Sequence, residues 1–178
     1  GRSQAGVVTN NSYIYILNGS GYDYSHINPD GTLGSWTTIG FVGPYGVVTW
    51  PAAIAIGNNI YFSGGFDVMA EKYVYRYPVN PNGTLGNPST EKSLNYGHAN
   101  HAHVYYNGYL YAIGGGPNEY TVVNPNGSLG SWMVLTSALH FGVRSNPPST
   151  AWIYNGFIYY YYPRSDINAV TIEKAPIN

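Results

Sequence analysis

The sequence predicts an all-β protein assembled from repeats, on the strength of a recurring turn, a recurring pair of strand patterns and the absence of helical periodicity. The turn reads NPDGTLGSW at 28–36, NPNGTLGNP at 80–88 and NPNGSLGSW at 124–132. Self-similarity at a regular period is the sequence mark of a repeat architecture. These recurrences say far more about the fold than about any chemistry.

A second element recurs upstream of the turn. It reads NNSYIYILNG at 10–19, GNNIYFSGG at 57–65, YNGYLYAIGG at 106–115 and YNGFIYYYYP at 154–163. Its aligned tyrosines are spaced by 46, 50 and 48 residues, at Tyr15, Tyr61, Tyr111 and Tyr159. The chain therefore divides into four units, predicted at 5–40, 50–95, 100–137 and 149–178.

Unit 3 shows the predicted order of strands within one unit. An apolar strand at 102–106 leads through Asn107-Gly108 into an aromatic strand at 109–113. Asn and Gly accept the positive φ angles that a two-residue hairpin turn requires. Strands at 120–123 and 132–135 complete the unit, with the NPNGSLG turn between them. Short strands separated by turn signals every 8–12 residues indicate antiparallel β structure.

The pattern YNG-x-[LI]-Y-x-x-GG, followed by a third strand and a tryptophan, resembles a kelch repeat. Trp36 and Trp132 occupy the tryptophan position, while Pro88 replaces it in unit 2 and Tyr162-Pro163 replaces Gly-Gly in unit 4. The resemblance implies a kelch-type β-propeller with about four four-stranded blades, the last of them incomplete. It also implies that Trp36 and Trp132 pack between blades.

The number of blades leaves three architectures open. Propellers have roughly four to eight blades, and kelch propellers usually have six or seven. The chain is therefore expected to be a compact four-bladed ring, a half-ring that pairs with a second copy, or a piece of a longer protein. An open half-ring exposes an aromatic face and an unpaired strand edge. Self-association or a larger parent protein is favoured for that reason.

The composition excludes several classes of function. Only 8% of residues are charged and the net charge is −1, so no basic surface for nucleic acid or an anionic membrane is expected. The chain has no cysteine, which excludes disulfides and thiolate chemistry. No apolar stretch approaches the roughly 20 residues of a membrane-spanning helix.

A histidine cluster, GHANHAH, is the sharpest candidate for chemistry. It contains His98, His101 and His103, and the last two would project from the same face of a strand. Neutral imidazoles at this spacing can ligate Zn²⁺ or Cu²⁺, with His98 or the distant His140 as a third ligand. The alternative, which we favour, is a buried histidine at the start of a repeat and no cofactor.

Two tryptophans are candidates for ligand binding. Trp50 and Trp152 lie in or beside the first strands of units 2 and 4, and aromatic side chains with neighbouring Asn and Asp suit a neutral polyhydroxylated ligand. The histidine cluster is the other candidate for ligand contact. Both tryptophans also fit a packing role.

Four positions match the pattern Asn-x-Ser/Thr, namely Asn10, Asn18, Asn82 and Asn126. Three of them read Asn-Gly-Ser/Thr, which is also favourable turn chemistry. Sequons on turns of a charge-poor chain predict an extracellular or cell-surface glycoprotein.

The sequence is thus interpreted as a non-catalytic extracellular binding or structural module that recognises a protein or glycan or takes part in assembly. A sugar-binding lectin or adhesin is the first alternative. A metal-dependent enzyme built on the histidines is the second.

Overall fold

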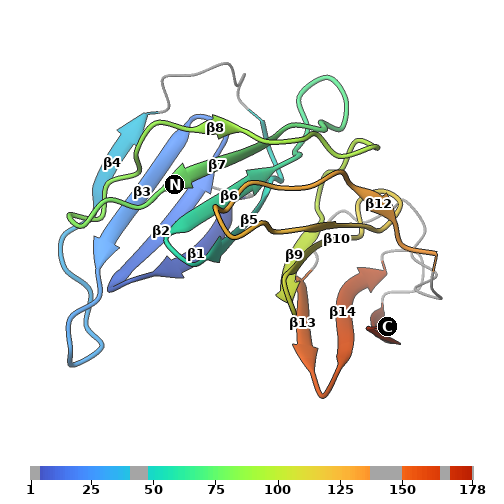
Figure 1. Ribbon diagram of the computed structural model, residues 1–178. Helices are drawn as coiled ribbons and strands as arrows, with labels where there is room; N and C mark the ends of the chain where they lie inside the picture. The colour runs from blue at the N-terminus through green and yellow to red at the C-terminus, as the bar shows by residue number, and fades with distance from the viewer. Residues whose placement is uncertain (1–4, 41–47, 137–149, 165–168, 178) are drawn as a thin grey trace.

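The protein is described here by a computed structural model that covers residues 5–40, 48–136, 150–164 and 169–177 (Figure 1). All regular structure in these ranges is β-strand, in four separate antiparallel sheets. The first sheet contains β1 (Gly6–Asn10), β2 (Tyr13–Asn18), β3 (Gly21–His26) and β4 (Thr37–Gly40). The second contains β5 (Ala52–Ile56), β6 (Asn59–Ser63), β7 (Val74–Pro78) and β8 (Ser89–Thr90).

The other two sheets follow the same plan. The third contains β9 (Ala102–Tyr106), β10 (Tyr109–Ile113), β11 (Glu119–Val122) and β12 (Met133–Val134). The fourth contains β13 (Thr150–Tyr154), β14 (Phe157–Arg164) and β15 (Ala169–Pro176). We call the four sheets blades 1 to 4. Each falls within one of the four predicted units; residues 137, 149, 165–168 and 178 of those units lie outside the described ranges.

The hairpins form where the sequence predicts them. Strands β9 and β10 have the predicted bounds, and the turn between them places Asn107 and Gly108 at φ angles of 47° and 83°. Two positive φ angles in a two-residue loop match the twist of the flanking strands. Strand β11 begins one residue earlier than predicted, and β12 is shorter because only two of its residues pair with β11.

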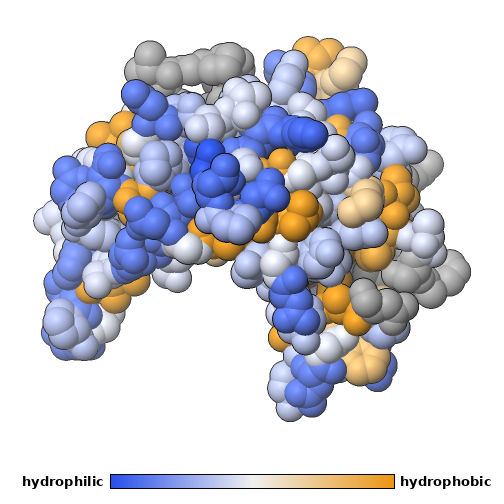
Figure 2. Space-filling view, viewed as in Figure 1, coloured by the Kyte–Doolittle hydropathy of each residue, from blue (hydrophilic) through white to orange (hydrophobic). Residues whose placement is uncertain are grey.

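The sheets are arranged like the blades of a four-bladed β-propeller, so the predicted all-β propeller class is confirmed. The first strand of each blade lies beside the first strand of the next, from β1 through β5 and β9 to β13. Within the described residues no comparable packing joins β13 back to β1. The blades form an open arc, and Figure 2 shows a hollow between its two ends.

Each pair of neighbouring blades shares one apolar core. Blades 1 and 2 meet at a cluster that includes Tyr15, Leu17, Ile60 and Phe62. Blades 2 and 3 meet around Trp132 and its neighbours, and blades 3 and 4 share a third cluster. The inner strands of blades 2 and 3 are therefore covered on both faces, which explains why they are apolar at successive positions.

The recurring turn has the same internal hydrogen bonds in blades 1, 2 and 3. In blade 2 the Asn80 amide donates to the Thr84 hydroxyl at 2.9 Å, and that hydroxyl donates to Asn82 Oδ1 at 2.7 Å. The same side-chain bonds occur in blades 1 and 3, where Asp30 and Asn126 take the place of Asn82. Asn, Asp, Ser and Thr favour such local bonds to their own turn, so the repeated residues build a repeated shape.

The turns of blades 2 and 3 also bind the preceding blade. The Tyr15 hydroxyl of blade 1 donates to the Gly83 carbonyl at 2.9 Å, and the Tyr61 hydroxyl of blade 2 donates to the Gly127 carbonyl. These are the aligned tyrosines of the repeat. The repeat position of Tyr15 and Tyr61 therefore corresponds to a contact between neighbouring blades.

Candidate functional site

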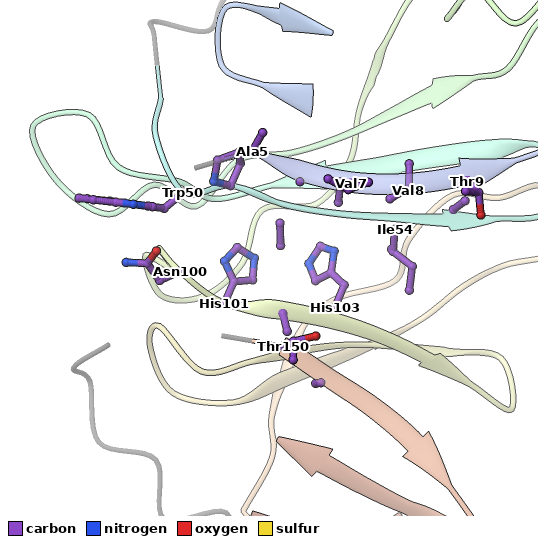
Figure 3. Close-up of a pocket in the computed structure, with 17 residues that line it drawn as sticks. Ala5, Val7, Val8, Thr9, Trp50, Ile54, Asn100, His101, His103 and Thr150 are labelled. Atoms are coloured by element: carbon purple, nitrogen blue, oxygen red, sulfur yellow. The ribbon is translucent and has the colours of Figure 1, made fainter. Parts of the chain in front are cut away.

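A cavity of about 450 Å³ lies where the first strands of the four blades converge (Figure 3). Its polar and aromatic lining comes from Thr9, Trp50, Asn100, His101, His103 and Thr150, with small apolar residues between them. No Asp, Glu, Lys or Arg is among the described residues that line it. The volume is within the range of small-molecule sites, roughly 300–1,000 Å³.

Two histidines form one wall of this cavity. His103 is on β9, and His101 is the residue directly before this strand. Both rings point from the same side of the chain toward β5. Both Nε2 atoms lie 2.9 Å from the hydroxyl of Ser63, the last residue of β6. A hydroxyl donates only one hydrogen bond, so at least one of the two Nε2 atoms carries a proton and donates to Ser63.

Burial keeps both of these imidazoles neutral. It lowers the pKa of His103 to about 3 and that of His101 well below its ordinary value, with the neighbouring histidines adding to both shifts. Neither ring is then a proton acceptor poised for catalysis near neutral pH. Their Nδ1 atoms are buried and make no hydrogen bond with the described part of the protein.

The third histidine belongs to a different network. His98 is fully buried, with Nδ1 2.9 Å from the Gly114 carbonyl and Nε2 3.1 Å from a Glu119 oxygen. Both partners accept hydrogen bonds, so the ring is placed to donate from Nδ1 to the Gly114 carbonyl and from Nε2 to the Glu119 carboxylate. The backbone amides of Asn95 and Tyr96 also donate to Glu119.

Opposing effects set the protonation of Glu119. Burial alone would raise its pKa, but the hydrogen bonds from His98, Asn95 and Tyr96 outweigh burial and hold the pKa below its ordinary value. The carboxylate therefore stays ionised and ties blade 3 to the segment that leads into it. It is sealed in the protein interior, with its side chain fully buried.

The three histidines of the predicted metal cluster lie close together but do not converge on one point. Their ring centroids are 5.2 Å apart for His98 and His101 and 5.0 Å apart for His101 and His103. Among the described residues no group of three His, Cys, Asp or Glu side chains is arranged to hold a metal ion. A Zn²⁺ or Cu²⁺ ion would have to replace the bonds to Ser63 and Glu119. His140 lies outside the described ranges.

The two candidate tryptophans are in different places. Trp50 is at the rim of the cavity, half-buried, with a φ angle of 57° and its ring 5.9 Å from that of Phe66. Trp152 is outside the cavity lining, on the far side of blade 4, where it stacks on Tyr159 with ring centroids 5.6 Å apart. The structure therefore groups Trp50 with His101 and His103, and separates Trp152 from them.

The tryptophans at the repeat position also differ. Trp132 is buried in the core between blades 2 and 3, and its indole N–H donates to the Lys92 carbonyl at 2.9 Å. Trp36 is 45% exposed. The expectation of packing between blades thus holds for Trp132, while no blade packs against Trp36 in the part of the chain that the structure describes.

The four sequon asparagines lie on or beside turns. Asn82 and Asn126 are exposed and bond within their own turns, and Asn18 Oδ1 accepts hydrogen bonds from Ser20 in the same way. The Asn10 amide donates to the Gly57 carbonyl of blade 2 at 2.7 Å. These contacts account for the asparagines as turn residues; glycosylation stays a prediction.

Sequence reasoning missed Ser63 and Glu119. Glu119 is 21 positions after His98, so no local motif joins them, although a carboxylate opening an otherwise uncharged strand was a usable signal. Ser63 is the last residue of β6 and directly follows Tyr61 and Phe62. Only the packing of blade 2 on blade 3 shows that it meets two histidines.

Comparison with known proteins identifies a fold but no family. No protein-family model matches the chain, and no curated protein has a similar sequence. A solved structure described as that of YjhT is similar, with a TM-score of 0.66 and 14% sequence identity. The match covers 98% of this chain and 66% of that one, so this chain spans only about two thirds of its length. The kelch resemblance is supported as far as the propeller arrangement.

Proposed function

We propose that this chain is a non-catalytic binding module that holds a small neutral polar ligand, such as a terminal sugar of a glycan, in its central cavity. The observation that carries this proposal is the uncharged lining of the cavity. Ligand sites combine apolar and aromatic walls with a few polar groups that fix orientation. Here the indole of Trp50 offers an apolar face, and Asn100, Thr9 and Thr150 offer the polar groups.

The same lining argues against catalysis in the cavity. Glycoside hydrolysis uses a pair of carboxyl groups that flank the scissile bond, and general acid–base catalysis needs a group with a pKa near the working pH. The described lining residues include no carboxylate, and burial keeps the two histidines neutral. The second candidate function is recognition of a protein segment, in place of a glycan, at the same surface.

An extracellular or cell-surface location goes with this proposal. It is supported by the four sequons and by the low content of charged side chains. The described residues include no helix whose length and hydropathy would let it cross a membrane.

The test is a glycan array probed with the purified chain, followed by titration of any glycan that is retained. We expect binding to be lost in Trp50→Ala and kept in Trp152→Ala, a matched loss of an aromatic side chain outside the cavity. Loss in Trp152→Ala alone would move the site to blade 4. Failure to retain any glycan would leave protein recognition as the binding function, and turnover of a retained glycan would contradict a non-catalytic module.

Metal analysis separates this proposal from a histidine-based enzyme. We expect the purified chain to carry less than one equivalent of zinc or copper. Stoichiometric metal that is lost in His101→Ala would favour the metal-dependent enzyme instead.

A further inference from the structure

One face of blade 1 lacks the cover that the same face has in the other blades. On the second strand, the residues beside the repeat tyrosine are fully buried in blades 2 and 3: Ile60, Phe62, Leu110 and Ala112. The equivalent residues of blade 1, Ile14 and Ile16, are only half-buried. Further out on the same blade, Leu33 and Trp36 are each 45% exposed, whereas Leu129 and Trp132 are 3% and 5% exposed. This face of blade 1 therefore carries the apolar residues that pack against a neighbouring blade in blades 2 and 3.

The turn of blade 1 also has two unused backbone groups. In blade 2 the Gly83 carbonyl accepts from Tyr15, and the Leu85 amide donates to the Tyr22 hydroxyl at 2.9 Å. The Gly31 carbonyl and Leu33 amide hold these positions in blade 1 and bond to no described residue. A side chain added at Gly31 would meet nothing within 4 Å.

The corresponding contact to blade 3 uses a tyrosine and a cation together. Tyr61 pairs with Arg76 across β6 and β7. The Tyr61 hydroxyl donates to the Gly127 carbonyl, and Arg76 Nη1 donates to the adjacent Asn126 carbonyl at 2.9 Å. This pair holds the turn of the following blade at two successive carbonyls.

Blade 4 presents the same pair on its uncovered face. Tyr159 of β14 pairs with Lys174 of β15 in the register that joins Tyr61 to Arg76. Lys174 is exposed, with its Nζ 5.2 Å from the centre of the Phe157 ring, and the neighbouring Trp152 and Ile172 are 41% and 59% exposed. Within the described residues the Tyr159 hydroxyl has no hydrogen-bond partner.

We propose that blade 4 of a second copy of this chain docks on blade 1, with Tyr159 donating to the Gly31 carbonyl and Lys174 binding at Asp30. Charge complementarity supports this choice of occupant. Of the three turns, only that of blade 1 has a carboxylate, Asp30, where the others have Asn82 and Asn126. Among the three turns, the acid is thus found on the one that faces no blade in the described part of its own chain, and Lys174 supplies the opposite charge.

The contact is head-to-tail, because it joins different faces of the two copies. Such contacts close into a ring or continue from copy to copy, and the described residues of both end faces include exposed apolar side chains, Trp36 on blade 1 and Ile172 on blade 4. This assembly is independent of ligand binding in the cavity. Asp30 and Lys174 are exposed side chains, so reversing their charges leaves the cores between blades intact.

Native mass spectrometry and light scattering of charge-reversal variants test the proposal. The 19.4 kDa chain is expected at twice or a higher multiple of its mass at about 50 μM, a concentration at which a complex with a Kd of about 1 μM or lower is largely formed. Asp30→Lys and Lys174→Glu should each weaken self-association by about tenfold or more, since each places like charges together. A one-to-one mixture of the two variants should restore assembly, because it pairs reversed with reversed and native with native charges.

Lys72→Glu is the matched control. This exposed lysine precedes β7 of blade 2, away from both proposed docking faces, and its Nζ donates to the Asn95 carbonyl. It should assemble as the unaltered chain does, and circular dichroism should show that all variants keep their β structure. A single-chain mass for the unaltered protein at 50 μM would overturn the proposal. So would self-association that charge reversal leaves unchanged, or variants that do not reassemble on mixing.

Discussion

The turns of blades 1 and 3 have nearly the same sequence but very different surroundings. Residues 28–33 and 124–129 read NPDGTL and NPNGSL, and their internal hydrogen bonds match. The blade 3 turn is bound by Tyr61, Arg76 and Glu91 of blade 2, whereas the blade 1 turn makes no such bonds with the described residues. The comparison teaches that the repeat encodes both a local shape and a docking site for a neighbour, and that the local shape forms without that neighbour.

The largest difference is expected for the two repeat tryptophans. Trp132→Ala should lower the free energy of unfolding by about 3–5 kcal/mol, the usual cost of removing a buried aromatic ring. Trp36→Ala should cost less than about 1 kcal/mol, because its side chain is half exposed. Urea unfolding in the Lys174→Glu background, where self-association is weakened, measures both. Equal losses would mean that Trp36 is covered within its own chain.

The buried histidines between blades 2 and 3 should also make stability depend on pH. His101 and His103 are neutral when folded, with lowered pKa values, and take up protons near pH 6.5 once unfolded. The unfolded state then binds more protons below that pH. Stability is therefore full above about pH 6.5 and falls toward pH 3 by about 1.4 kcal/mol per pH unit for each ring. The lowered pKa of Glu119 adds a further loss at the acidic end.

Urea midpoints between pH 7.5 and pH 4 measure this dependence. His103→Gln should remove about half of the slope between pH 6 and pH 4, because one of two titrating rings is gone. A flat profile through pH 6 to 4 would contradict burial of the two rings as neutral groups.

A smaller difference is expected for the glycines of the turns. Gly31 and Gly83 have φ angles of 83° and 81°, so alanine at either position incurs about 1–2 kcal/mol of backbone strain. At Gly83 the added Cβ would also lie 2.4 Å from the Tyr13 ring, which adds about 1–3 kcal/mol of overpacking. Thermal unfolding of Gly31→Ala and Gly83→Ala compares them. Identical shifts would show that Tyr13 does not press on the blade 2 turn.

Much of the fold could be predicted because its signals are local. The Asn107-Gly108 turn, the aromatic strand around Tyr111 and the repeated NPxG turns each act within a few residues of chain. The candidate site was only partly predictable for the opposite reason. Whether His98 pairs with Glu119 and whether Ser63 meets His101 depend on how whole blades pack, which no spacing in the sequence records.

The uncovered state of Trp36 illustrates the same limit. Its residue type and position in the repeat match those of Trp132, and both predict burial. The difference arises because blade 1 has no described blade before it. A repeat motif predicts which interface a residue can form. Whether that interface forms depends on the presence of a neighbouring blade.

Amide hydrogen exchange at three equivalent leucines tests the central comparison most directly. The Leu85 and Leu129 amides donate to Tyr22 and Glu91 of the preceding blade, and the Leu33 amide has no such acceptor among the described residues. In dilute Lys174→Glu protein, we expect Leu33 to exchange at least about a hundredfold faster than the other two, since covered amides exchange only through opening of the structure. Equal protection at all three leucines would contradict an uncovered blade 1.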